Sequence, residues 1–421
     1  MGQHSEHSGN SGSLSTSRRS FLRYAALAAA TPVLTEAHFA RAAQAAVKPA
    51  AAGGRHDYYL APPPNAVIIN ANENPLGPCQ AARDAIARLT PTSGRYDLYG
   101  ETDQLIKTFS SQHQLSEDYI SVYAGSSEPL HYTVLAFTSP TRSLVIADPS
   151  YEAPMAAATA AGAKIHKVPL TGNQAHDVKA MINADANAGV FYICNPNNPT
   201  GTLTTKQDIV WALENKPKGS VLLIDEAYIH FSDAPDVLDL VAADKDIVVL
   251  RTFSKIYGMA GLRCGFALAR PDLLARLSRY GENPMPVTGS GAAHASLLDT
   301  NLVATRKKVM TDIRNENIAW LKQNGYKVIG ESQSNFFMID TGRSGKAVMK
   351  AMQDRNIYIG RTWPIWPNAV RITVGTPEEM ARFRTAFKQV MDAPPGPEPT
   401  PSQTAMADGV RPPRFTRDSQ G

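Results

Sequence analysis

Five short apolar runs constrain the fold of this chain more than any other feature of its sequence. They cover residues 144–148, 190–194, 221–225, 247–250 and 265–269. Several are apolar at consecutive positions, a pattern typical of strands that are buried on both faces of a mostly parallel sheet. The stretches between them are amphipathic and predict helices. We therefore expect an α/β fold, a three-layer sandwich with a mostly parallel central sheet.

A second, smaller α+β unit is expected after this sheet. A helical pattern runs from about residue 291 to residue 323 and ends at an Asn-Gly pair. Candidate strands follow at 327–329, 336–340, 357–359 and 370–374. A last helix is predicted to begin after Thr376, because Pro377 suits a first turn and Glu379 completes a capping box with the threonine.

The two ends of the chain do not have the composition of a packed core. The stretch before residue 66 is rich in Ala, Gly and Pro, and the last residues are rich in Pro, so we expect a linker and a disordered tail. The expected segments are a signal peptide (1–45), a linker (46–65), an N-terminal segment that packs on the small domain (66–95), a large domain (96–290), a small domain (291–392) and a disordered tail (393–421).

The N-terminus predicts export by the twin-arginine machinery. Arg18 and Arg19 lie in the run Ser-Arg-Arg-Ser-Phe-Leu-Arg (17–23), which precedes a weakly apolar stretch at 24–34 and Ala-x-Ala cleavage sites within 40–46. The apolar stretch is too short to remain as a membrane anchor. Because the twin-arginine route carries folded proteins, we expect an enzyme that folds in the cytoplasm and works in the periplasm.

Composition points to a small-molecule function. A formal net charge of +4 over 421 residues gives no electrostatic case for binding nucleic acid. The cysteines Cys79, Cys194 and Cys264 are scattered without the spacing of metal ligands, and they cannot form a disulfide framework. We expect three buried thiols and no metal site.

Lys255 is the residue around which the candidate site is predicted. It follows the apolar run 247–250 and two hydroxyl residues, Thr252 and Ser254, and it precedes Arg263. Its amine could form a Schiff base once it is desolvated, while the arginine and the hydroxyl groups could hold a phosphate. Pyridoxal phosphate requires both. The alternative is a lysine at the end of a strand on a glycine-containing loop.

Two further features fit a phosphorylated ring. Ser126 and Ser127 follow the apolar run 120–123 and precede a helical pattern, which puts their hydroxyls and amides at a helix N-terminus, where anions bind. Tyr151 could stack on an aromatic ring. Taken separately, these residues also fit an ordinary helix cap and a buried tyrosine.

Asp225 ends one of the most apolar runs, where a carboxylate without a cationic partner is costly. A protonated pyridine nitrogen would supply that partner, and the ring would then act as an electron sink. Asn198, in a rigid turn at 195–201, and Tyr228 could hydrogen-bond the ring phenolate. The alternative is a capped aspartate beside a core tyrosine.

The order of these motifs resembles the fold-type I aminotransferases of class I and II, and within them the histidinol-phosphate aminotransferase branch. The resemblance spans about residues 65 to 391 and implies a large domain like that of aspartate aminotransferase. Its motifs are Asn-Pro-Asn-Asn-Pro-Thr-Gly (195–201), Asp-Glu-Ala-Tyr (225–228), Arg-Thr-Phe-Ser-Lys (251–255), Gly-Leu-Arg (261–263), Asn-Glu-Asn-Pro (72–75), Arg-Tyr (95–96) and Arg-Ile-Thr-Val-Gly (371–375).

The resemblance implies that Lys255 binds pyridoxal phosphate as a Schiff base and moves a proton as general base and acid, with Asp225 and Tyr228 as the other catalytic residues. The cofactor-binding residues implied by the resemblance are Ser126, Ser127, Thr252, Ser254 and Arg263 at the phosphate, Tyr151 over the pyridine, Asp225 at the ring nitrogen, and Asn198 and Tyr228 at the phenolate.

The resemblance also implies substrate contacts and a homodimer with shared active sites. Arg371 would bind the substrate α-carboxylate through its planar guanidinium, and Arg361 would lie near the distal end of the substrate. Tyr96 of the partner subunit would reach the phosphate. Because Asp97 replaces the proline that usually follows that tyrosine, Tyr99 remains an alternative.

The expected reaction moves an amino group from an L-amino acid, or a histidinol-phosphate-like amine, to a 2-oxo acid. Decarboxylation or oxygen-dependent oxidation of an amino acid on the same scaffold is one alternative, and a binding protein without turnover is another. The aromatic residues at 363–367 could wall a flat side chain or cover the small domain, so the substrate stays open. Histidine biosynthesis is cytoplasmic, which does not fit an exported enzyme.

Overall fold

The computed structural model describes residues 62–281 and 283–399 of the chain. The expected signal peptide, most of the expected linker and most of the expected tail lie outside these residues. Within the described ranges, no helix is both long enough and apolar enough to cross a membrane. All three cysteines are buried and unpaired, as expected.

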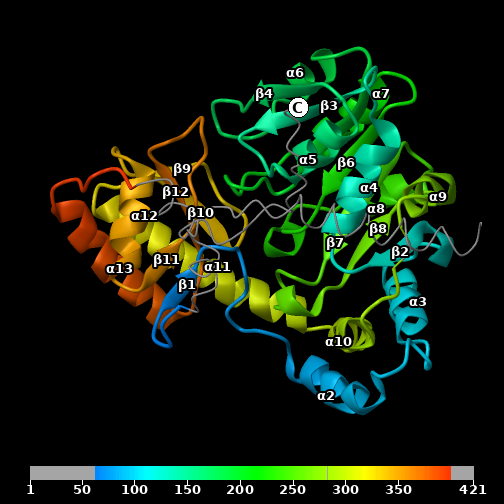
Figure 1. Ribbon diagram of the computed structural model, residues 1–421, viewed down its shortest axis with the longest axis horizontal. Helices are drawn as coiled ribbons and strands as arrows, with labels where there is room; N and C mark the ends of the chain where they lie inside the picture. The colour runs from blue at the N-terminus through cyan, green and yellow to red at the C-terminus, as the bar shows by residue number, and fades with distance from the viewer. Residues whose placement is uncertain (1–61, 282, 400–421) are drawn as a thin grey trace, which may run out of the picture. The chain divides into compact units, whose positions relative to one another are not determined.

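A seven-stranded sheet forms the centre of the large domain (Figure 1), and its strand order is β2-β8-β7-β6-β5-β3-β4. The strands are β2 (Ile120–Tyr123), β3 (Ser143–Asp148), β4 (Ile165–Pro169), β5 (Ala188–Cys194), β6 (Val221–Asp225), β7 (Ile247–Thr252) and β8 (Gly265–Leu268). Strands β3 to β7 are parallel to one another, and β8 is antiparallel to both of its neighbours. The prediction of a mostly parallel sheet is confirmed.

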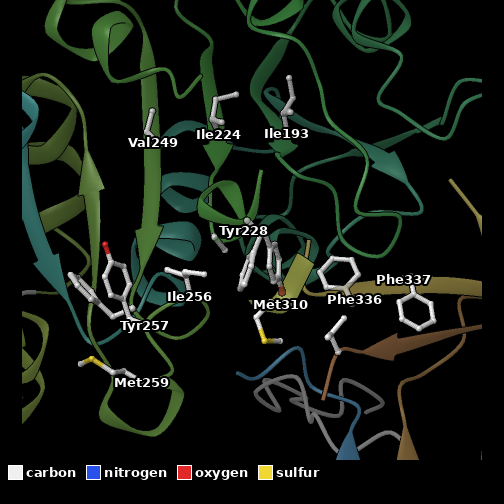
Figure 2. Packing of buried hydrophobic residues seen from close by; sticks show 14 of the residues in the cluster. Ile193, Ile224, Tyr228, Val249, Ile256, Tyr257, Met259, Met310, Phe336 and Phe337 are labelled. Carbon is white, nitrogen blue, oxygen red and sulfur yellow. The ribbon is translucent and has the colours of Figure 1, made fainter. Parts of the chain in front are cut away.

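Helices cover both faces of this sheet. Side chains alternate along β6, so that Leu222 and Ile224 belong to one core cluster and Leu223 belongs to another. Figure 2 shows the first cluster, in which Ile193, Ile224 and Val249 come from adjacent strands. The first cluster packs against α3 (Glu101–His113), α6 (Val178–Asn183), α7 (Lys206–Asn215) and α8 (Leu238–Ala242), and the second against α4 (Ser127–Phe137), α5 (Ala153–Ala160) and α9 (Pro271–Ser278).

The register of the central strands brings the polar motifs together. Cys194 at the end of β5 pairs with Asp225 at the end of β6, and Asp225 pairs with Leu250 of β7. All residues of these three strands are buried. The segments that follow them therefore emerge side by side at one edge of the sheet, which is where ligands bind in this class of fold.

The small domain holds a second sheet with the order β12-β10-β9, in which all pairs are antiparallel. The first strand of the described chain, β1, pairs in parallel with β11, so the N-terminal segment is joined to this domain. The capping box of Thr376 and Glu379 is present at the start of the last helix, as predicted. The elements are β1 (Val67–Ile69), β9 (Lys327–Ile329), β10 (Phe336–Asp340), α12 (Gly345–Gln353), β11 (Ile357–Ile359), β12 (Ala369–Thr373) and α13 (Pro377–Asp392).

The prediction of one helix from about residue 291 to 323 is wrong. The structure has two helices, α10 (Val287–Leu298) and α11 (Leu302–Gln323). The carboxylate of Asp299 accepts a hydrogen bond from the backbone N–H of Asn301, a local contact that competes with helix continuation. Helix α11 contacts η4 (Ile229–Phe231) of the large domain as well as β9 and β10, so it links the two domains (Figure 1).

The remaining elements are short or lie at the periphery. Strand β4 was not among the predicted strands, since Val168 is its one buried residue and it forms an edge of the sheet. The segment 66–95 was expected to pack on the small domain, but only β1 joins the small-domain strands. Helix α2 packs against α10 instead of the small-domain sheet. These elements are α2 (Gln80–Leu89), η2 (Thr90–Thr92), η3 (Glu117–Tyr119), η4 (Ile229–Phe231) and η5 (Ala260–Leu262).

Candidate active site

One cavity of about 470 Å³ lies at the carboxyl ends of the central strands and is closed by segments of the small domain and by the loop after β1. It contains every site residue that the sequence predicted except Tyr96. Those that line it are Ser126, Ser127, Tyr151, Asn198, Asp225, Tyr228, Thr252, Ser254, Lys255, Arg263, Arg361 and Arg371. Among the described residues there is no group of His, Cys, Asp and Glu side chains that could hold a metal ion.

Lys255 lies three residues beyond the end of β7. Its Nζ donates a hydrogen bond to the carbonyl oxygen of Ala71 at 3.3 Å and lies 5.6 Å from the centre of the Tyr228 ring. Enclosure in the cavity and the nearby guanidinium of Arg371 lower the pKa of Lys255 to about 8. Because the neutral amine is the nucleophilic form, this environment activates the lysine.

Asp225 is a buried carboxylate with no ion-pair partner among the described side chains. It accepts hydrogen bonds from the hydroxyl of Tyr192 at 3.0 Å and from the backbone N–H of Ala227 at 3.1 Å. Burial raises the pKa of Asp225. A cation placed in the cavity would remove the cost of this unpaired charge, and a protonated pyridine nitrogen has the required chemistry.

An anion cradle lies at the start of α4. Gly125 has a φ of +91°, and a Cβ there would lie 2.1 Å from Nη2 of Arg263, so only glycine leaves room for this guanidinium. Arg263 donates hydrogen bonds to Oγ of Ser254 at 3.3 Å and to the carbonyl of Ala124 at 3.1 Å. The Thr252 hydroxyl donates to the same Ser254 oxygen at 2.9 Å. Hydroxyls, a helix N-terminus and a guanidinium therefore converge, and together they fit a phosphate group.

Tyr228 is held by a residue that the sequence did not single out. The side-chain amide of Asn72 donates to the Tyr228 hydroxyl at 3.0 Å, and the backbone N–H of Asn72 donates to Oγ1 of Thr373 at 2.9 Å. Asn72 is buried and has a left-handed backbone conformation with a φ of 55°. It lies in the Asn-Glu-Asn-Pro motif, which was the available signal. The Tyr228 ring also packs edge-on against Phe336 (Figure 2).

Arg371 projects from β12 and is 5% exposed. Its Nη1 donates to Oδ1 of Asn198 and its Nη2 to the carbonyl of Asn70, both at 2.7 Å. Its buried Nε has no hydrogen-bond partner in the part of the chain that the structure describes. Burial lowers the pKa of Arg371 to about 10, so the guanidinium still carries its charge at neutral pH. A carboxylate in the cavity would pair with the charge of this guanidinium.

One acidic residue beside Arg361 was not predicted as a site residue. The guanidinium of Arg361 donates to the carboxylate of Glu152, which lines the same cavity. It also lies over the ring of Trp363, with 4.7 Å between the guanidinium carbon and the ring centre. Tyr151, the neighbour of Glu152, lines the cavity, and its burial raises the pKa of its hydroxyl.

Tyr96 and Tyr99 are not part of this cavity. Their side chains are 80% and 65% exposed, and the neighbouring Leu98 is 66% exposed. Within one subunit, therefore, neither tyrosine joins the other predicted site residues.

Comparison with known proteins places this arrangement in a family. The model of the family "Aminotransferase class I and II" matches residues 64–387. A histidinol-phosphate aminotransferase of Symbiobacterium thermophilum is 33% identical over 330 residues, which are 77% of this chain and 90% of that protein. An aromatic amino acid aminotransferase of Cutibacterium acnes is 32% identical over 333 residues, which are 78% and 93% of the two chains.

A solved structure has the same fold. The crystal structure of histidinol-phosphate aminotransferase from Sinorhizobium meliloti in complex with pyridoxal-5'-phosphate superposes with a TM-score of 0.71 at 24% identity, covering 77% of this chain and 91% of that one. The relatives favour transamination over the decarboxylase, oxidase and non-catalytic alternatives. This chain belongs to the family of class I and II aminotransferases, and it is a pyridoxal-phosphate-dependent transaminase.

Proposed function

We propose that Lys255 is the lysine that binds pyridoxal phosphate and moves the proton at the substrate α-carbon. When bound, pyridoxal phosphate supplies an electron sink for the bonding electrons of that carbon. The pKa of about 8 supports this role, because near neutral pH the amine can both take up and release a proton. Its position beside Asp225 and Tyr228 in one cavity supports it as well.

The other residues would hold the cofactor by its three polar ends. Asp225 would pair with the pyridine nitrogen and keep it protonated. Because Asn72 donates to the Tyr228 oxygen, the hydroxyl proton of Tyr228 is left for the ring phenolate, which Asn198 would also contact. Tyr151 would stack on the pyridine. The phosphate would lie in the cradle of Ser126, Ser127, Thr252, Ser254 and Arg263.

Arg371 would bind the α-carboxylate of an amino acid or a 2-oxo acid. Its two terminal nitrogens are fixed by Asn198 and Asn70, which orient the guanidinium plane before substrate arrives. Each terminal nitrogen carries a second N–H, which can donate to the incoming carboxylate. Holding the substrate at this end fixes the α-carbon relative to Lys255.

The working unit would be a homodimer in which the partner subunit's Tyr96, or in its place the partner's Tyr99, completes the phosphate site. The exposure of both tyrosines and of Leu98 supports this, because large apolar side chains cluster on surfaces that other proteins cover. A protein that sediments only as a monomer while fully active would contradict the proposal.

The enzyme would act in the periplasm after twin-arginine export. The run Ser-Arg-Arg-Ser-Phe-Leu-Arg, the apolar stretch and the Ala-x-Ala sites support this. Changing Arg18 and Arg19 together to lysine should leave the protein in the cytoplasm, whereas undiminished export of that variant would refute the assignment.

The convergence of Lys255, Asp225 and the Arg263 cradle in one cavity carries the proposed reaction. Purified protein should show a visible absorption band that an amino acid bleaches and a 2-oxo acid restores, because the amino group is stored on the protein between the two half-reactions. Lys255→Ala should lack the band, whereas Lys308→Ala, a change at an exposed lysine on α11, should keep it. Bleaching that no 2-oxo acid reverses would contradict transamination.

A further inference from the structure

The cavity also contains an ion pair between two domains. Arg361, which follows β11 in the small domain, donates through Nη2 to Oε2 of Glu152, which precedes α5 in the large domain. The two side chains are 28% and 30% exposed, and both line the cavity. A pair that is enclosed to this degree is only partly screened by water.

One aromatic ring fixes the position of this pair relative to Arg371. Trp363 is 1% exposed, and the guanidinium carbons of Arg361 and Arg371 lie 4.7 Å and 5.6 Å from its centre. Both contacts are within the range of cation–π attraction. If Arg371 holds the α-carboxylate, as the proposed function states, the substrate side chain extends toward the Glu152 and Arg361 pair.

We propose that the Glu152 and Arg361 pair makes this site select amino acids with neutral side chains, and that Glu152 is the residue that disfavours anionic ones. This inference rests on the proposed function, because it takes Arg371 as the carboxylate site. An anionic side chain would be attracted to Arg361 but would meet Glu152. To gain the arginine it must displace the carboxylate, which then remains unpaired in an enclosed site. A cationic side chain would be attracted to Glu152 but would have to displace Arg361, which would then remain unpaired.

A neutral side chain leaves the pair intact. It can pack on the apolar residues that line the same cavity, which include Leu130, Tyr151, Ala153 and Ala156.

Non-reactive carboxylates test the inference on the holoenzyme without turnover. Isothermal titration would compare 3-phenylpropionate, glutarate and 5-(trimethylammonio)pentanoate, which carry a neutral, an anionic and a cationic end and have no primary amine that could react with the cofactor. The wild type should bind 3-phenylpropionate most tightly. Glu152→Gln should raise the affinity for glutarate about tenfold relative to 3-phenylpropionate, which corresponds to about 1.4 kcal/mol. Arg361→Gln should instead favour 5-(trimethylammonio)pentanoate by about the same factor.

Glu73→Gln is the matched control. Glu73 lines the same cavity and has no ion pair among the described side chains, so its change removes a negative charge without releasing Arg361. In the Glu73→Gln enzyme, the affinity for glutarate relative to 3-phenylpropionate should change by less than about twofold. A wild type that prefers glutarate, or ratios unchanged in both Glu152→Gln and Arg361→Gln, would overturn the inference. Because these ligands do not react, the binding ratios test the selectivity inference alone. A failure of amino transfer would contradict the proposed function and would be observed separately.

Discussion

The phosphate cradle predicts a specific effect of adding one methyl group at Gly125. The Cβ of alanine would lie 2.1 Å from Nη2 of Arg263, far inside contact distance, so the guanidinium must leave its position. Losing one charge-assisted contact to a phosphate costs about 1.5 to 3 kcal/mol. Gly125→Ala should therefore raise the dissociation constant for pyridoxal phosphate by about tenfold to hundredfold.

The assay is a fluorescence titration of the apo-enzyme with pyridoxal phosphate. Gly325→Ala is the matched control, because Gly325 also has a positive φ, +78°, but no atom lies within 4 Å of the position of its Cβ. Both variants carry the backbone strain of alanine at a positive φ, and Gly125→Ala alone disturbs the cradle. If both variants bind the cofactor equally well, the reasoning about the cradle is refuted.

Two other predictions concern stability and assembly. Burial lowers the pKa of His176 to about 4. Between pH 6.5 and 4 the unfolded chain therefore binds a proton that the folded chain does not. As the pH drops through this range, the free energy of unfolding should decrease by about 3 kcal/mol from this group. Urea titrations should show a weaker acid dependence in His176→Gln, and an identical dependence would contradict this. Co-expressed Lys255→Ala and Tyr96→Phe subunits should form mixed dimers with one intact site, more active than either variant alone; absence of such complementation would contradict a shared site built on Tyr96.

Much of the cofactor half of the site could be predicted because it follows directly from strand ends. Asn198, Asp225 and Thr252 lie at or just after β5, β6 and β7, and parallel strands in register bring such positions to one edge of a sheet. The apolar runs located those strands, and the motif order supplied the chemistry. Both the position and the identity of these side chains could therefore be predicted from the sequence.

Other features could not be predicted in the same way, because they depend on contacts between distant segments or on one local hydrogen bond. Glu152 and Arg361 are 209 positions apart and meet only when the two domains pack. Asn72 reaches Tyr228 across 156 positions from a loop that shows no periodicity. The break between α10 and α11 depended on one local hydrogen bond of Asp299, which helical periodicity does not detect.

Lys255 is the residue proposed to carry the cofactor, and chemical trapping tests this most directly. Borohydride reduction of the holoenzyme should fix pyridoxal phosphate to the protein, and mass spectrometry of the proteolytic peptides should find the added mass on Lys255 within the segment Arg-Thr-Phe-Ser-Lys. Prior incubation with an amino acid should prevent the labelling, because the substrate amine takes the place of the lysine. Label on any other lysine, or no label on a protein that shows the visible band, would contradict the account.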